Sequence, residues 1–135
     1  MFDIPLHKLL VHFPVAFATF AFVYDAWAIY GRRPHLHATG YSLGFWATLG
    51  ALAAVVSGLQ IANLGQIAKG VITGHALFGL SAGIVLTAFG LWRYSARARR
   101  SNSEEEYNLL WLVIEGIAAL LILATAVTGH RLALI

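Results

Sequence analysis

The sequence contains no cysteine and very little charge. The absence of cysteine excludes disulfides, thiolate metal ligands and the Cys-x-x-Cys-His attachment of c-type haem. Only 11% of the 135 residues are charged, whereas a soluble domain carries about a quarter. Hydrophobic residues make up 59% of the chain, which is more than a soluble protein of this size can bury. The composition therefore indicates an integral membrane protein.

The beginning of the chain lacks the basic residues of a secretory signal peptide. Met1-Phe2-Asp3-Ile4-Pro5 carries no Lys or Arg, and no Ala-x-Ala cleavage pattern follows the first apolar run. We therefore expect the first apolar segment to remain in the mature protein.

Four apolar segments are long enough to cross a bilayer, which requires about 20 residues. Short connections join them, so neighbouring helices are expected to be antiparallel. The sequence therefore predicts an all-α, up-down-up-down four-helix transmembrane bundle that forms a single domain over residues 1–135. The expected spans are residues 5–30, 41–61, 68–94 and 109–135, with connections near 31–37, 63–66 and 93–107.

The basic residues are unevenly divided between the two ends of this bundle. One end has six arginines, and the other has only two lysines and one arginine. Because Lys and Arg favour the cytoplasmic side, we expect a multi-pass protein of the bacterial inner membrane with both termini periplasmic or extracellular. The six arginines are Arg32, Arg33, Arg93, Arg97, Arg99 and Arg100, and the opposing residues are Lys8, Lys69 and Arg131.

Four histidines are expected near the end of the bundle that has few basic residues. His7 lies close to the interface, and His12 and His75 each follow the start of a span by about seven residues, or roughly 10 Å. His130 lies near the end of the fourth span. Histidine within a membrane span is rare, and functional sites are where it occurs. His35 and His37 are expected in a basic loop at the opposite end; they are not part of this group.

Haem is the cofactor that this group favours. The first and third helices of an antiparallel bundle lie diagonally across the core, so His12 and His75 are expected to ligate one haem b iron from opposite sides. His7 and His130 form a second pair for a second haem, or partners for haem propionates. A copper or zinc site made by three or four of these histidines is the alternative, although a site of histidines alone limits the choice of metal.

Several polar and small residues lie at a suitable depth to support the cofactor. Thr73, Thr128 and Gln60 are expected to orient imidazoles, or else to make hydrogen bonds within and between helices. Gly74 and Gly79 give a flat ligand access to the third helix, or else allow close helix packing.

Two acidic residues lie inside spans near the arginine-rich end. A functional interpretation makes Asp25 and Glu115 proton carriers or polar partners of a bound quinone. The structural alternative pairs them with Arg32, Arg93 or Arg97.

The opening Leu10-Val11-His12-Phe13-Pro14, preceded by His7, resembles that of a bacterial family of four-helix membrane domains of unknown function. The usual opening of that family reads His-Pro-x-x-Val-His-Phe-Pro, and histidines follow in the third span and near the end of the fourth. His75 and His130 stand at those places, whereas Lys8 replaces the proline. Members joined to electron-transfer domains imply a b-type cytochrome role.

We therefore expect a membrane b-type cytochrome that transfers electrons through bis-histidine haem, as a subunit of a larger redox complex or together with a quinone. It is expected to be an electron-transfer protein rather than an enzyme by itself. The expected partners are the lipid bilayer, other redox proteins or a quinone, and a further copy of the chain in a homo-oligomer, but not nucleic acid. The alternative is a non-haem membrane protein, either a metal or proton carrier or a structural subunit.

Overall fold

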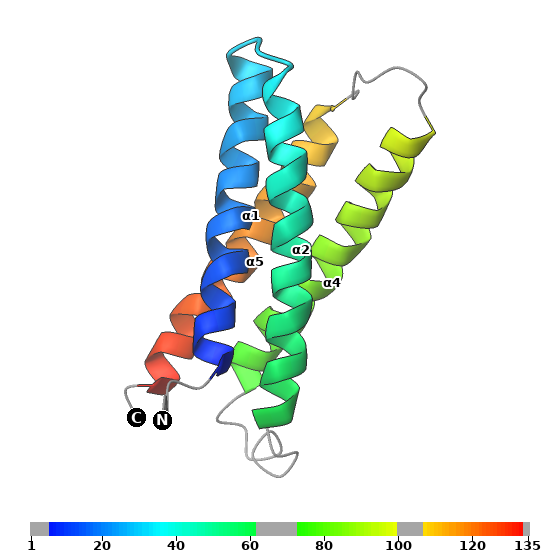
Figure 1. The fold of residues 1–135 in the computed structure, drawn as a ribbon. Helices are drawn as coiled ribbons and strands as arrows, with labels where there is room; N and C mark the ends of the chain where they lie inside the picture. The colour runs from blue at the N-terminus through cyan, green and yellow to red at the C-terminus, as the bar shows by residue number, and fades with distance from the viewer. Residues whose placement is uncertain (1–5, 62–72, 100–106, 134–135) are drawn as a thin grey trace.

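The computed structural model describes residues 6–61, 73–99 and 107–133, and these residues form a bundle of long helices (Figure 1). The first and last helices have their outer ends, Leu6 and Ala133, at the same end of the bundle. The predicted all-α four-helix bundle is confirmed. The helices are α1 (Leu6–Tyr30), α2 (Leu36–Ile61), α4 (Thr73–Ala98) and α5 (Leu109–Ala133).

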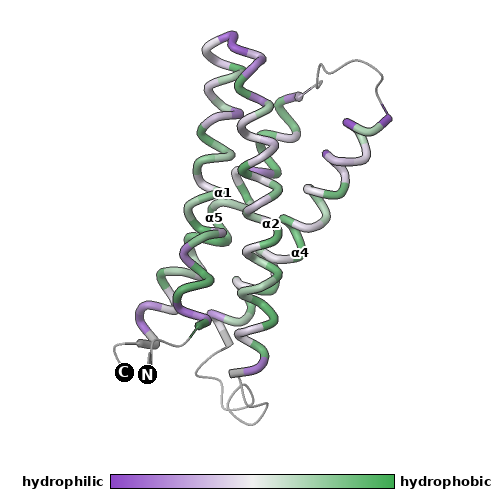
Figure 2. Tube along the Cα trace, in the orientation of Figure 1, coloured by the Kyte–Doolittle hydropathy of each residue, from purple (hydrophilic) through white to green (hydrophobic). Residues whose placement is uncertain are grey.

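All four helices are long and apolar enough to cross a membrane. Polar residues gather toward the ends of the bundle, and the middle is apolar (Figure 2). Two boundaries differ from the prediction: α2 begins at Leu36 rather than at residue 41, and α4 continues to Ala98 rather than 94. The extra turns at the start of α2 contain His37, a polar residue that was expected in a connection but is buried. Arg93, at the expected boundary between the third span and its connection, is inside α4 and buried as well. The expected turn at 63–66 and residues 100–106 of the third connection lie outside the described residues.

Neighbouring helices pack around the bundle in the order α1, α2, α4, α5, with α5 closing onto α1. Helices α1 and α4 therefore lie on one diagonal, as the antiparallel topology predicts. The packing of α1 on α2 is the most extensive, whereas α4 leans away from α2 toward its Ala98 end (Figure 1). Helices α1 and α4 run in the same direction, so their first turns lie at the same end of the bundle.

The core consists mostly of alanine, while the large apolar side chains face outward. Small core residues allow membrane helices to approach closely, and outward-facing Leu, Val, Phe and Trp suit contact with lipid. Pro14 lies inside α1, where it is buried against Gly50 of α2. The buried cluster is Ala18, Ala47, Ala51, Ala82, Leu86, Ala118 and Ile122.

Candidate functional site

His7 and His75 lie beside each other at the end of the bundle where α1 and α4 begin. Their ring centres are 6.2 Å apart, and the ring planes are nearly perpendicular at 86°. Both side chains are half-buried. Because the two residues belong to the diagonal helices, their rings meet across the interior of the bundle rather than on its outer surface.

The Nδ1 atom of each ring is held by a hydrogen bond. The Nδ1 of His75 lies 2.9 Å from the carbonyl oxygen of Thr125, which can only accept, so the nitrogen donates. The Nδ1 of His7 lies 2.9 Å from the Oγ of Ser57, and that hydroxyl donates to the carbonyl oxygen of Ala54. His7 therefore also donates from Nδ1. A neutral imidazole that donates from Nδ1 carries its lone pair on Nε2, the atom through which a metal can bind.

Glycines on the other two helices make room for both rings. A Cβ added at Gly129 of α5 would lie 2.8 Å from the Cε1 of His75, and one added at Gly58 of α2 would lie 3.0 Å from the Cε1 of His7. Carbon atoms do not approach this closely without displacement. A side chain at Gly129 would therefore displace the His75 ring, and one at Gly58 would press on the His7 ring, so both imidazoles pack closely on glycine backbone.

His12 and His130 point away from this pair. Both are exposed, and the Nδ1 of His12 lies 2.5 Å from the carbonyl oxygen of Lys8 on its own helix. Each helical residue advances by about 100°, so five residues turn His12 about 140° away from His7. The expected axial pair of His12 and His75 is therefore not brought together by the structure, which places His7 next to His75 instead.

Of the polar residues expected to support the cofactor, Thr128 lies near the imidazole pair. The Oγ1 of Thr128 lies 3.4 Å from the Nδ1 of His75 and donates to a carbonyl of its own helix. Gln60 is exposed at the end of α2. The side chain of Thr73 lies outside the described part of the chain.

The two expected glycines do not surround the imidazoles. A Cβ at Gly74 would meet nothing within 4 Å, and one at Gly79 would lie 3.3 Å from the methyl group of Thr125. Gly79 therefore serves the packing of α4 on α5. Gly58 and Gly129 were missed because a glycine pattern in a sequence does not show which glycine faces a ring.

A second polar centre lies at the opposite, arginine-rich end of the bundle. Asp25 of α1 is completely buried and receives hydrogen bonds from the Nη1 and Nη2 of Arg93, at 2.7 and 3.2 Å. The Nδ1 of His37 donates to the same carboxylate at 2.6 Å, and Arg93 also donates to the carbonyl oxygen of His37. The expected pairing of Asp25 with an arginine is thus found with Arg93.

Glu115 of α5 joins this centre from the other side. Its Oε1 lies 3.6 Å from the Nη1 of Arg93, and its Oε2 accepts a hydrogen bond of 2.5 Å from the hydroxyl of Tyr107. Burial, followed by the charge of Glu115, raises the pKa of the Tyr107 phenol above its ordinary value, so this hydroxyl retains its proton. The ring of Tyr107 stacks on His37, with centres 4.5 Å apart.

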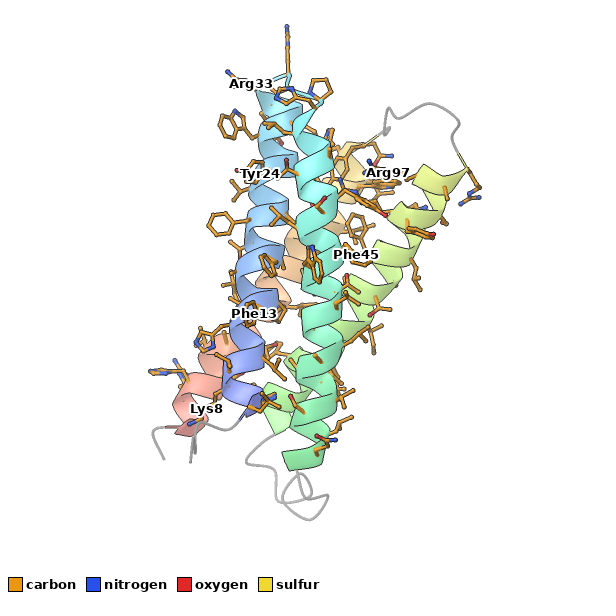
Figure 3. The ribbon with its side chains drawn as sticks, viewed as in Figure 1. Lys8, Phe13, Tyr24, Arg33, Phe45 and Arg97 are labelled. Atoms are coloured by element: carbon orange, nitrogen blue, oxygen red, sulfur yellow. The ribbon has the colours of Figure 1, made fainter. Side chains whose placement is uncertain are left out.

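Aromatic rings and guanidinium groups extend the centre toward the end of α4. The guanidinium carbon of Arg93 lies 4.7 Å from the ring centre of Tyr107 and 5.6 Å from that of Tyr41, and that of Arg97 lies 4.3 Å from the Tyr41 ring. Arg97 reaches from α4 toward α2 (Figure 3). Cation–π contacts therefore link α2, α4 and the start of α5 where α4 leans outward.

The sequence interpretation missed His37 and Tyr107. Both lie in segments that the sequence predicts as connections, although His37 is inside α2 and nine-tenths buried. The available signal was Asp25 itself, since a carboxylate inside a span needs several donors.

The described residues contain no group of three or more His, Asp or Glu side chains arranged to hold a metal ion. The expected alternative of an ion bound by three or four histidines therefore has no counterpart in this part of the chain.

Comparison with known families matches residues 3–135 to the model of the family called predicted membrane protein, DUF2231. The chain belongs to this family. No curated protein and no solved structure matches it. In this DUF2231 protein, two polar centres occupy opposite ends of the spans: the imidazole pair of His7 and His75, and the ion-pair centre around Asp25. The rise of α1 separates His7 from Asp25 by about 27 Å.

Proposed function

We propose that this protein is a membrane b-type cytochrome, an electron-transfer protein that binds haem iron between His7 and His75. The observation that carries the proposal is the pair of Nε2 lone pairs offered by imidazoles from diagonal helices. Bond lengths between a metal and an imidazole nitrogen are about 2 Å, which sets the ring centres of two axial ligands roughly 6 Å apart. The 6.2 Å between the two rings is compatible with that spacing.

The surroundings of the two rings suit axial ligands. Metal-bound histidines usually donate their other ring N–H to a carbonyl or another polar group, which fixes the tautomer and the ring direction. Thr125 and Ser57 accept such bonds here, and Gly58 and Gly129 leave the space for the rings. The chain has no thiolate, and the described residues hold no carboxylate grouped with the two imidazoles, whereas most bare metal ions require such ligands.

With both histidines as ligands, a bound haem would be suited to electron transfer. Haem supplies a one-electron couple when bound, and an iron with two protein ligands has no open position for oxygen. The protein's own contribution is to fix both imidazoles as Nδ1 donors and to bury them in part, which sets the polarity around the couple. Lys8 and Arg131, exposed cations at this end, are suited to pair with propionates.

The proposal includes an orientation and a class of partner. The arginine-rich end lies in the cytoplasm of a bacterial inner membrane by the positive-inside rule, which puts the histidine pair at the periplasmic side. A redox protein, a quinone or a second copy of the chain then meets the pair there. The exposed His12 and His130 face outward at the same end, where such a partner or a second haem would contact them.

The test is the dithionite-reduced minus oxidised absorbance spectrum of protein purified in mild detergent from cells supplied with haem. The proposal predicts a Soret band and the α-band of bis-imidazole haem b. Colourless protein that fails to bind added haem contradicts it. Metal analysis of the same sample then separates an ion-binding protein from a structural subunit.

A further inference from the structure

The centre around Asp25 contains two buried carboxyl groups that meet at one guanidinium. The Nη1 of Arg93 lies 2.7 Å from the Oδ2 of Asp25 and 3.6 Å from the Oε1 of Glu115, and the two carboxyls interact with each other. Asp25 is 0% exposed, and Arg93 and Glu115 are each 3% exposed. Water therefore screens neither negative charge.

Of the two buried carboxyls in the described part of the chain, Asp25 is the closer counter-ion of Arg93. Asp25 accepts hydrogen bonds from both terminal nitrogens of the Arg93 guanidinium, whereas the Oε1 of Glu115 lies beyond hydrogen-bond distance of Nη1. One guanidinium neutralises one carboxylate. A second negative charge at this depth is costly, and two carboxyls that face each other relieve it by sharing a proton.

The charged and titratable groups that face the pair come from every packed element. Among residues 6–61, 73–99 and 107–133, they are His37 and Tyr41 of α2, Arg93 and Arg97 of α4, and Tyr107 just before α5. His37 donates to Asp25, and Tyr107 donates to the Oε2 of Glu115, so Oε2 is the oxygen that can receive a proton from Tyr107. Arg97 contacts Tyr41 rather than either carboxyl in the interactions described above.

We propose that Asp25 and Glu115 are a proton-binding carboxyl pair that holds one exchangeable proton beside Arg93 and exchanges it with water through Tyr107. Tyr107 is half-buried outside the spans and is hydrogen-bonded to Glu115, so it lies between the pair and the aqueous face. In the uptake step, the tyrosine hydroxyl passes its proton to the Oε2 of the Glu115 carboxylate and takes another from a hydronium ion, which leaves as water; release is the reverse. The only charge that this step moves toward the membrane-spanning part of the protein is that of one proton.

Infrared spectroscopy of the purified protein at neutral pH tests the proposal, with or without haem. A protonated carboxylic acid has a carbonyl stretch well above the amide bands, and deuteration shifts it. We expect this band in the wild-type protein, its loss in Glu115→Gln, and its retention in the control Asp3→Asn. In Tyr107→Phe the band should remain, but its shift after transfer to D₂O should slow at least tenfold.

Several outcomes overturn the inference. Absence of the band in the wild-type protein means that both carboxyls are ionised, with His37 carrying the proton. A band unchanged by Glu115→Gln belongs to another acid, and equally fast exchange in Tyr107→Phe excludes the hydroxyl as the route. Circular dichroism and gel filtration in detergent establish that each variant is folded. Since none of these measurements depends on haem, failure of the cytochrome proposal leaves this test intact.

Discussion

At the scale of single residues, the ring orientation of His7 and His75 is set by atoms on other helices that the sequence pattern does not identify. The carbonyl oxygen of Thr125 and the hydroxyl of Ser57 occupy both Nδ1 atoms, so each Nε2 is directed elsewhere. Gly129 gives His75 the space to hold this orientation, since its missing Cβ would overlap the ring. The orientation of the His75 imidazole therefore depends on the Thr125 carbonyl oxygen and on the lack of a side chain at Gly129.

We predict that Gly129→Ala weakens haem binding because the added methyl group displaces the His75 ring or breaks its bond to Thr125. Changes that disturb the groups orienting a metal ligand lower affinity about 10–100-fold, and we expect a loss in that range by spectroscopic haem titration. The control is Gly74→Ala, beside His75 in the chain but with open space at its Cβ. Equal affinities for the two variants would contradict this account of the packing of His75 on Gly129.

At the scale of helices, the pairing of α1 with α2 depends on where glycine occurs in α2. Gly40 lies against the Asp25 carboxylate, and Gly58 lies against His7, so glycines appose α1 at both polar centres. The close approach is needed at the arginine-rich end because the Asp25 carboxylate must reach His37 and Arg93 at once. Helix packing and the buried ion pair are therefore linked through one residue.

Replacement of Gly40 by alanine is predicted to destabilise the protein. The new Cβ would overlap the Asp25 carboxylate, and overpacking costs about 1–3 kcal/mol. Loss of helical signal during SDS titration of protein in mixed micelles measures the change in the free energy of unfolding.

The matched control for Gly40 is Gly44→Ala, one turn further along α2. A Cβ there would be 4.0 Å from the Oε1 of Glu115, an ordinary contact, so the expected change is below about 0.5 kcal/mol. If Gly44→Ala costs as much as Gly40→Ala, the helix tolerates no alanine in general and the contact with Asp25 is not the cause.

At the scale of the whole molecule, charge and apolar length determine the topology. The described part of the chain keeps basic residues abundant at one end and places the imidazole pair at the other. In the orientation that we propose from the positive-inside rule, the arginine-rich end would face the cytoplasm. Electrons would then enter or leave the protein at the periplasmic side, while the proposed proton site faces the cytoplasm.

Single cysteines test this orientation because the native chain has none. We expect His35→Cys, in the exposed connection between α1 and α2, to resist a membrane-impermeant maleimide in intact cells and to react after permeabilisation. Gly74→Cys, exposed at the histidine end, should react in intact cells. The reverse labelling pattern would show that the protein has the opposite orientation.

The length and spacing of the apolar runs were enough to predict the bundle and its diagonal helices. The relative depths of the histidines were not predicted, because His75 was expected level with His12, whereas its ring lies beside His7. The sequence did not show which residues of each helix face the core, because helices in lipid are apolar both on the core side and on the lipid side. His12 therefore seemed as good a partner for His75 as His7, although only His7 faces inward. His37 and Tyr107 were missed for a different reason: their neighbours are polar, and only folding shows that Asp25 and Glu115 draw them inside.

The most direct test of the cytochrome proposal compares four single variants, His7→Ala, His12→Ala, His75→Ala and His130→Ala, by reduced minus oxidised spectra at equal protein concentration. Haem held between His7 and His75 predicts that the bis-imidazole α-band disappears in His7→Ala and His75→Ala and persists in the other two. Retention of the band in His7→Ala together with its loss in His12→Ala would contradict the assignment of the inward-facing pair.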